Sequence, residues 1–244
     1  MSKFNTIVTG TGRCGTGYFA ALLNSMGLIC GHESVFNLSG LGSAKKRIAG
    51  EKPFTVSCTC GHEQCKESCM SNVLKEIKGA ELQADSSYLA APFLDDDDFK
   101  NYNFIHVLRN PIDVIKSFVQ VANYFNENDI PKHSIFFQEF IKLHLSEVYE
   151  NSFSQADRGY LYYVGWNKMI QNKLKNRNKI VYRVEENNEN RILNFLKKEN
   201  CDFDLKIKKI NHWKNDNGEH LRFKVFGKEV ADLLDQYEKG EFCS

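Results

Sequence analysis

A glycine-rich segment near the start of the chain constrains the fold more than any other feature. Glycines stand at positions 10, 12, 15 and 17. The preceding residues 4–8 are apolar and β-branched, which predicts a strand, and apolar residues recur at helical spacing over 18–26. Glycines between a strand and a helix let backbone N–H groups converge on an anion at the positive end of the helix dipole. The segment therefore predicts a phosphate or sulfate site.

Further strands and helices follow along the chain. Residues 104–108 predict a buried strand, after which Pro111 is placed for the first turn of a helix that continues through Phe118. Residues 179–184 predict a third, central strand, and helices are expected within 134–176, 191–198 and 221–238. Alternating strands and helices imply a parallel sheet covered on both faces. We expect an α/β fold, a three-layer sandwich with a central parallel sheet.

Composition limits the partners. A chain of 244 residues can bury one substantial core, so we expect a single domain over 1–244. The 32 Lys and Arg residues are balanced by 31 Asp and Glu residues, which leaves a net charge of +1. The overall electrostatic field of the chain therefore does not favour nucleic acid or an acidic membrane as a partner. No apolar stretch approaches the roughly 20 residues of a membrane helix, and the start leaves no room for a signal peptide. We expect a soluble, cytoplasmic protein. The acidic run 95–98 is expected to be a solvated loop.

The glycine-rich loop departs from the pattern that holds nucleoside triphosphates. That pattern places Lys directly after the last glycine and then Ser or Thr for magnesium, whereas Gly15 is followed by Thr16 and Gly17. The cation is instead Arg13, inside the turn, whose planar guanidinium can donate to a bound anion. The alternative is a tight glycine turn with a surface arginine. This departure disfavours hydrolysis of a nucleoside triphosphate.

A second candidate anion site follows the predicted strand 104–108. Arg109 stands at the carboxyl end of that strand, where open α/β sheets bind ligands, and Ser117 lies two turns along the next helix. A helix opened by Pro111, with Asp113 favouring its dipole, explains those two residues but not Arg109. The sequence therefore predicts a second anion contact at Arg109.

These two segments resemble the two donor motifs of one enzyme family. Residues 10–17, Gly-Thr-Gly-Arg-Cys-Gly-Thr-Gly, are similar to the 5′-phosphosulfate loop of sulfotransferases that use 3′-phosphoadenosine 5′-phosphosulfate (PAPS), and 109–117 resemble their 3′-phosphate motif. The resemblance implies a P-loop NTPase-like sulfotransferase fold, with 3′-phosphoadenosine 5′-phosphate (PAP) as product. It assigns the donor to Gly12, Arg13, Cys14, Gly15, Thr16, Gly17, Arg109 and Ser117. Weaker similarities lie at 166–167, 182–185 and 213–214.

An acceptor hydroxyl or amine needs a base. The triplet Gly31-His32-Glu33 lies just past the first helix and resembles a segment that supplies a carboxylate base in this family, so Glu33 is the expected base. His32 is the alternative, because imidazole titrates near neutrality. Arg13 would stabilise charge on the leaving phosphate. Asp85 and Ser86, after a short predicted strand, are candidate acceptor contacts, although a helix N-cap would explain Ser86 as well.

Four cysteines cluster between the loop and Asp85, in an expected insertion around 58–69. Cys58, Cys60, Cys65 and Cys69, with His62 among them, could hold a structural zinc ion, form disulfides or remain free thiols. None of these states would carry the chemistry.

The acceptor has no clear signature in the sequence. A small molecule or a carbohydrate is expected, and the candidate acceptor loops 37–42 and 123–133 mix aromatic, polar and charged residues. Two other functions share the strand, turn and helix: a P-loop kinase of a nucleotide or small molecule, and a non-catalytic nucleotide-binding relative. The oligomeric state is left open.

Overall fold

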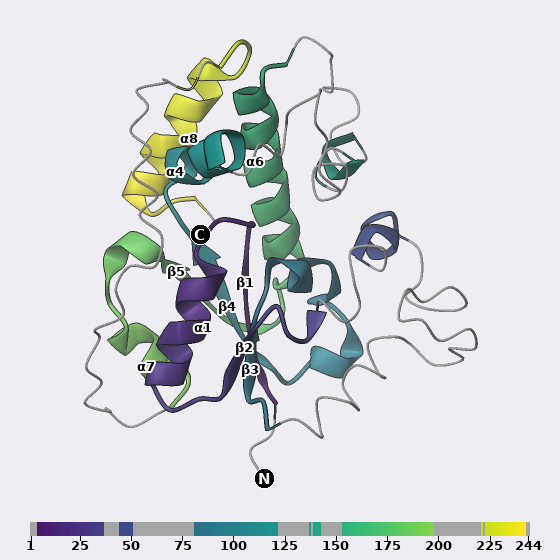
Figure 1. Cartoon of the computed structure of the whole chain (residues 1–244), viewed down its shortest axis with the longest axis vertical. Helices are drawn as coiled ribbons and strands as arrows, with labels where there is room; N and C mark the ends of the chain where they lie inside the picture. Colours follow the sequence, from purple (N-terminus) through teal and green to yellow (C-terminus); the bar gives the residue numbers. More distant parts are fainter. Residues whose placement is uncertain are drawn as a thin grey trace. The chain divides into compact units, whose positions relative to one another are not determined.

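The structure is a computed structural model that describes residues 4–36, 44–50, 81–121, 137, 139–142, 153–197, 221 and 223–242. It divides into two compact units (Figure 1): Met1–Leu108 with Met169–Ile210, and Arg109–Lys168 with Asn211–Ser244. The expectation of one domain over 1–244 stays a prediction. None of the described helices is long and apolar enough to cross a membrane.

A five-stranded sheet forms the centre of the first unit. Its strands stand in the order β2-β3-β1-β4-β5, and every neighbouring pair is parallel. This confirms the expected α/β class with a parallel sheet flanked by helices. The strands are β1 (Thr6–Gly10), β2 (Cys30–His32), β3 (Ala84–Ser86), β4 (Asn103–Leu108) and β5 (Asn178–Arg183).

The strand expected over 179–184 is present as β5, but its central position was wrong. Among the described strands, β5 pairs only with β4 and forms one edge of the sheet. Asn178 and Lys179 are accordingly exposed. A short apolar run predicts a strand without deciding between a centre and an edge, because the flanking polar residues fit a loop equally well.

Helix α1 (Thr16–Ser25) follows the glycine-rich loop as expected. Its apolar residues Phe19, Leu22 and Leu23 are fully buried. Gly27 ends the helix in the left-handed region, at φ 78°, and the N–H of Leu28 donates to the carbonyl of Leu23 at 3.0 Å. This is the usual glycine-terminated helix end.

The core of the first unit lies between α1, helix α7 (Asn190–Phe195) and the sheet. Side chains of both helices pack with those of β1, β4 and β5, including Phe19, Leu22, Val8, Ile105, Val107, Tyr182, Ile192 and Leu193. Figure 1 shows α1 and α7 on the left of the strands and η1 (Tyr88–Phe93) with η2 (Asp97–Phe99) on their right. Phe36, Phe93 and Phe99 form an aromatic group there. Helical residues 44–48 and η4 (Val184–Glu186) complete the unit.

The acidic run 95–98 is more than a solvated loop. Asp95 pairs with Arg47 at 3.1 Å and with Lys173 at 2.7 Å, and Arg47 also pairs with Asp96. Arg177 donates to the carbonyl of Asp95 at 2.7 Å. The run thus joins elements far apart in the sequence, and this correction reflects partners that no local pattern predicts.

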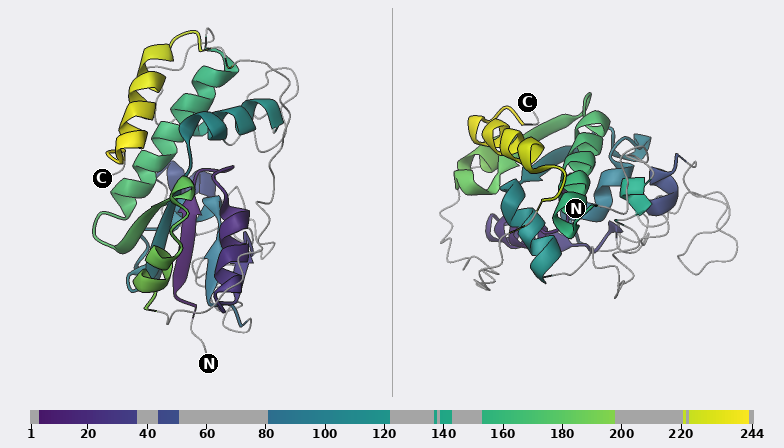
Figure 2. Two further views of the ribbon diagram at one scale, coloured as in Figure 1. Left: turned by 90° about the vertical axis from the view of Figure 1, so that its left-hand side faces the viewer. Right: turned by 90° about the horizontal axis from the view of Figure 1, so that it is seen from above.

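The second unit is helical. Helix α4 (Pro111–Lys116) continues as a π turn, η3 (Ser117–Val121), and packs with α6 (Gln155–Lys173), which crosses the unit boundary, and α8 (Gly227–Lys239) (Figure 2). Pro111 opens α4 as predicted, and the side chain of Asn110 caps it by accepting from the N–H of Ile112 at 2.9 Å.

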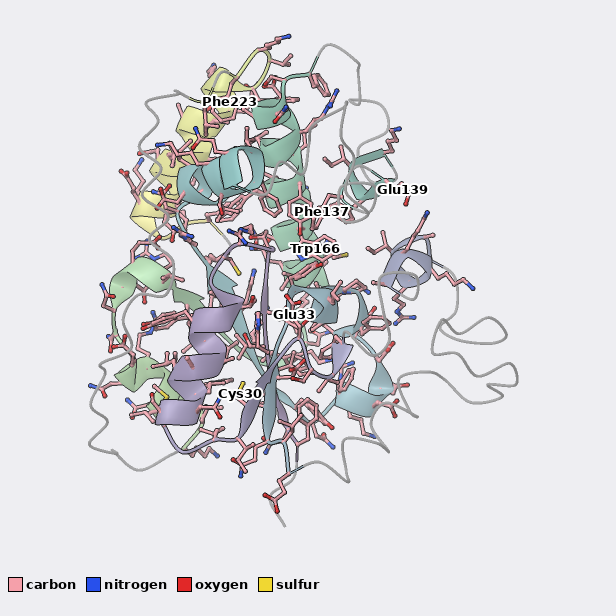
Figure 3. All side chains as sticks on the ribbon, in the orientation of Figure 1. Cys30, Glu33, Phe137, Glu139, Trp166 and Phe223 are labelled. Carbon is pink, nitrogen blue, oxygen red and sulfur yellow. The ribbon has the colours of Figure 1, made fainter. Side chains whose placement is uncertain are left out.

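Aromatic side chains form the core of this unit. Tyr162 lies with its ring centroid 4.6 Å from that of Phe137 and 5.0 Å from that of Phe118. The rings of Phe140 and Trp166 meet edge to face at 4.9 Å. Figure 3 labels Phe137 and Trp166 within this aromatic core. Such pairs contribute about 1 kcal/mol each beyond the area they bury.

A buried carboxylate fixes the start of α6 and the approach to α8. Asp157 is 0% exposed and accepts from the hydroxyl and the N–H of Ser154 at 2.6 and 2.8 Å. It also accepts from the N–H groups of Lys224, Val225 and Phe226, at 3.0, 3.2 and 3.2 Å. These bonds hold residues 224–226 outside a helix, which explains why α8 begins at Gly227 rather than near the predicted 221.

We expect Asp157→Asn to lower the free energy of unfolding at pH 7 by about 3 kcal/mol, because an amide cannot accept all five bonds and its own NH₂ would face N–H donors. Burial opposes ionisation, but the hydrogen bonds from Ser154 and residues 224–226 hold the pKa of Asp157 below its ordinary value. The native state therefore gains stability from this carboxylate above about pH 4, and the gain is lost as the pH falls further. Urea unfolding at pH 7 and pH 3 measures both effects. Asp232→Asn, an exposed matched control, should change neither.

Candidate functional site

The glycine-rich loop connects the end of β1 to the start of α1, and close packing explains its first glycine. A Cβ on Gly10 would stand 2.4 Å from the carbonyl oxygen of Val107 and 2.5 Å from the sulfur of Cys14. Cys14 is 0% exposed, so this predicted donor contact has its side chain in the core beneath the loop. Arg13, at φ 65°, and Gly15, at φ 104°, turn the backbone through the left-handed region.

The loop leads into the N-terminus of α1, which no described side chain caps. By contrast, Asn110 caps α4 and Ser87 caps η1. The first N–H groups of a helix have no partner within it, and they lie at the positive end of its dipole. The start of α1 at Gly15 and Thr16 is therefore suited to an anion, and the predicted phosphate or sulfate site stays a prediction.

His32 and Glu33 lie beside this helix start. The Nε2 atom of His32 is 3.2 Å from the hydroxyl of Thr16, and a Cβ on Gly17 would be 3.6 Å from the same nitrogen. The carboxylate of Glu33 is 3.8 Å from His32 Nε2. Their side chains are 46% and 32% exposed, so both remain open to solvent. The structure thus brings together Thr16, Gly17, His32 and Glu33.

The position of β2 in the sheet explains why His32 and Glu33 lie beside the start of α1. It runs parallel to β3 and β1 and ends at His32, so Glu33 follows at the edge of the sheet where β1 leads into the glycine-rich loop. In Figure 3, Cys30 and Glu33 are labelled at the two ends of β2. Glu33 itself adopts a left-handed backbone, at φ 55°, which is uncommon for a residue with a side chain.

Asp85 and Ser86 support this arrangement from β3. Both are 0% exposed and lie within the strand rather than after it. The hydroxyl of Ser86 donates to the carbonyl of Thr16 at 2.7 Å, and its own carbonyl accepts from the N–H of Glu33 at 3.1 Å. Asp85 accepts from the N–H groups of Ser34 and Val35 at 3.0 and 3.2 Å. Their described partners are all protein groups, and the predicted acceptor contact stays a prediction.

Burial governs the ionisation of the groups under this turn. It raises the pKa of Asp85 to about 6, against the opposing effect of the backbone hydrogen bonds from residues 34–36, and the charge of Glu33 raises it further. Burial, followed by the charge of Asp85, raises the pKa of the Cys30 thiol to about 12. Cys30 therefore stays protonated and unreactive at neutral pH.

The residue after β5 lies beside the loop. Val184 Cγ2, at the start of η4, is 3.8 Å from where a Cβ on Gly15 would stand. The hydroxyl of Tyr18, in the first turn of α1, is 3.4 Å from the carboxylate of Glu189. The weaker similarity at 182–185 to the sulfotransferase family stays a prediction.

Arg109 and Ser117 belong to the second unit. Arg109 directly follows the last residue of β4, Leu108, and its guanidinium pairs with Asp113 at 3.7 Å. The hydroxyl of Tyr163 donates to the carbonyl of Arg109 at 2.9 Å and so holds its backbone. Ser117 is the first residue of the π turn η3, and π turns occur frequently at functional sites. That these residues share one ligand with the loop stays a prediction.

Several other candidates have simpler explanations or cannot be placed. Trp166 and Asn167 are buried in the second unit, and Asn167 donates to the carbonyl of Tyr163 at 3.0 Å. His106, within β4, is buried at 1% exposure. Outside the described residues lie Cys58, Cys60, His62, Cys65, Cys69, the acceptor loops 37–42 and 123–133, and 213–214. Within the described part of the chain, no three His, Cys, Asp or Glu side chains are grouped to hold a metal.

Sequence reasoning missed the supporting roles of Asp85 and Tyr163. Burial of an aspartate within a strand requires hydrogen bonds to its carboxylate, but the partners of Asp85 come from a turn 50 residues away. No signal pointed to Tyr163, because tyrosine on a helix is compatible with the core.

Comparison with models of known protein families finds no match to this chain, and comparison with curated proteins finds none either.

We expect Gly10→Ala to lower the free energy of unfolding by about 2–3 kcal/mol, because the added methyl group would overlap the Val107 carbonyl and Cys14. Chemical unfolding followed by circular dichroism measures the change. Gly227→Ala is the matched control, since a Cβ there meets nothing within 4 Å, and it should be neutral or stabilising in a helix. A Gly10→Ala protein as stable as the wild type would contradict the described packing.

Proposed function

We propose that this chain is a PAPS-dependent sulfotransferase that transfers a sulfuryl group to a hydroxyl or amine of a small-molecule or carbohydrate acceptor. One observation carries the proposal: the glycine-rich loop leads into an uncapped helix start, with an imidazole and a carboxylate held beside Thr16. This places candidate anion-binding groups and a candidate base within one unit of the structure.

The donor would be held at both of its phosphorylated ends. The amides of Gly15 and Thr16, with Arg13, would bind the 5′-phosphosulfate, and Arg109 with Ser117 would bind the 3′-phosphate. The absence of Lys directly after Gly15 disfavours a nucleoside triphosphate, and the guanidinium of Arg13 can donate to two anionic oxygens of the donor at once.

The reaction would join the acceptor oxygen or nitrogen to sulfur while the bond between sulfur and the 5′-phosphate oxygen breaks. The acceptor proton would pass to Glu33, with His32 as the alternative base, and PAP would leave with the electron pair of the broken bond. Negative charge then grows on the 5′-phosphate oxygen, where helix amides and Arg13 would stabilise it. Exposure of both candidate bases leaves room for an acceptor to approach.

A thermal-shift comparison of PAP, ATP and AMP tests the donor class. We expect PAP at 100 times its dissociation constant to stabilise the protein by about 2.7 kcal/mol, with much smaller shifts for ATP and AMP at equal concentration. Arg13→Ala should abolish most of the PAP shift, because it removes a charge-assisted contact. Lys175→Ala, which removes an exposed cation elsewhere in the first unit, is the matched control and should leave it unchanged.

Equal stabilisation by ATP and PAP would contradict the proposal and favour a kinase. A selective PAP shift that is insensitive to Arg13→Ala would place the donor elsewhere on the chain. Selective binding of PAP without turnover of PAPS would favour a non-catalytic nucleotide-binding protein.

A further inference from the structure

We infer that Asp85 is a positioning residue whose buried carboxylate holds the turn that carries Glu33. The inference rests on the proposed function, because that function makes Glu33 the base. It assigns Asp85 a role that acts through Glu33 rather than through contact with an acceptor.

Three hydrogen bonds to β3 hold the turn that begins at Glu33. The N–H of Glu33 donates to the carbonyl of Ser86 at 3.1 Å, and the next two N–H groups, of Ser34 and Val35, donate to the Asp85 carboxylate. Neighbouring residues of β3 thus hold three consecutive amides of the turn. The left-handed backbone of Glu33 is unfavourable for a residue with a side chain, so it persists only where its surroundings determine it.

Asp85 is a buried carboxylate, at 0% exposure. A carboxylate removed from water is costly unless it is hydrogen-bonded. Its bonds to the turn meet this requirement. The carboxylate is needed because its two oxygens accept separate bonds, to Ser34 and Val35, whereas an amide offers one accepting oxygen.

Gly31 provides the space for this carboxylate. A Cβ at position 31 would stand 2.8 Å from Asp85 Oδ1 and 2.6 Å from the hydroxyl of Ser34. The contact of Asp85 with the turn therefore requires a glycine in β2, two residues before the base. Each residue of the triplet then has one role. Gly31 leaves space for the Asp85 carboxylate, His32 contacts Thr16, and Glu33 is the proposed base.

Asp85→Asn tests the inference by two readouts, with the exposed Asp97→Asn as the matched control. The first is hydrogen exchange at the amides of residues 34–36. The second is the release of PAP from PAPS with water as acceptor, which yields sulfate and needs no identified substrate. Both are compared in wild type, Asp85→Asn, Glu33→Gln and the double variant, and PAP binding is measured by thermal shift in each.

We expect Asp85→Asn to speed exchange at residues 34–36 and to lower the saturated rate of PAP release by roughly 10- to 100-fold, since displacement of a reacting group by about 1 Å has effects of this size. PAP binding should be unchanged. In the Glu33→Gln background Asp85→Asn should cause no further loss of rate, because both changes act through one group. Asp97→Asn should match the wild type throughout.

The inference would be overturned if the rate of PAP release in the double variant fell by the product of the two single-variant losses. A normal rate of PAP release in Asp85→Asn would also overturn it. If Asp85→Asn does not fold, Gly31→Ala takes its place and should show the same two defects; normal exchange and rate in Gly31→Ala would also overturn it. A wild type that fails to bind PAP would defeat the proposed function, while the exchange data would still decide whether Asp85 holds the turn. A wild type that binds PAP but releases none from PAPS would contradict the role of Glu33 and this inference with it.

Discussion

The hydrogen bond from the Ser86 hydroxyl to the carbonyl of Thr16 ties the end of β3 to the start of α1, and the candidate site depends on it. The carbonyl of Ser86 in turn accepts from Glu33, so one residue connects the glycine-rich loop to the turn after β2. The bond is 2.7 Å long and buried. The two hydrogen bonds of Ser86, one with Thr16 of α1 and one with Glu33 after β2, keep the candidate anion site and the proposed base in one arrangement.

The two carboxylates at this junction stand in different environments. Asp85 is buried, and its pKa is raised to about 6, whereas the side chain of Glu33 is 32% exposed beside His32. Burial suits a carboxylate that organises backbone amides, and exposure suits one that must meet an acceptor. Under the proposed function, support and chemistry would thus be divided between two acidic residues that are close in space and 52 residues apart in the sequence.

The sequence predicted the elements whose signals are local. Short apolar and β-branched runs located β1 and β4, and apolar residues at helical spacing located α1. These signals are local because backbone geometry and turn chemistry act over a few residues.

Features that depend on distant partners could not be predicted in this way. The edge position of β5 follows from which strands pair, and the roles of Asp85, Asp95 and Asp157 follow from donors that lie 48 to 67 residues away. An aspartate in a short strand, an acidic run and a helix start each admit several partners. The prediction that Arg109 and the glycine-rich loop bind one ligand likewise concerns residues that are far apart in the sequence.

A crystal structure of the chain with PAP tests the central claim most directly. The account predicts the 5′-phosphate within hydrogen-bond distance of the Gly15 and Thr16 amides, the 3′-phosphate at Arg109, and Glu33 facing the position of the missing sulfuryl group. A PAP molecule bound away from the start of α1, or bound with its 3′-phosphate in the loop, would contradict it.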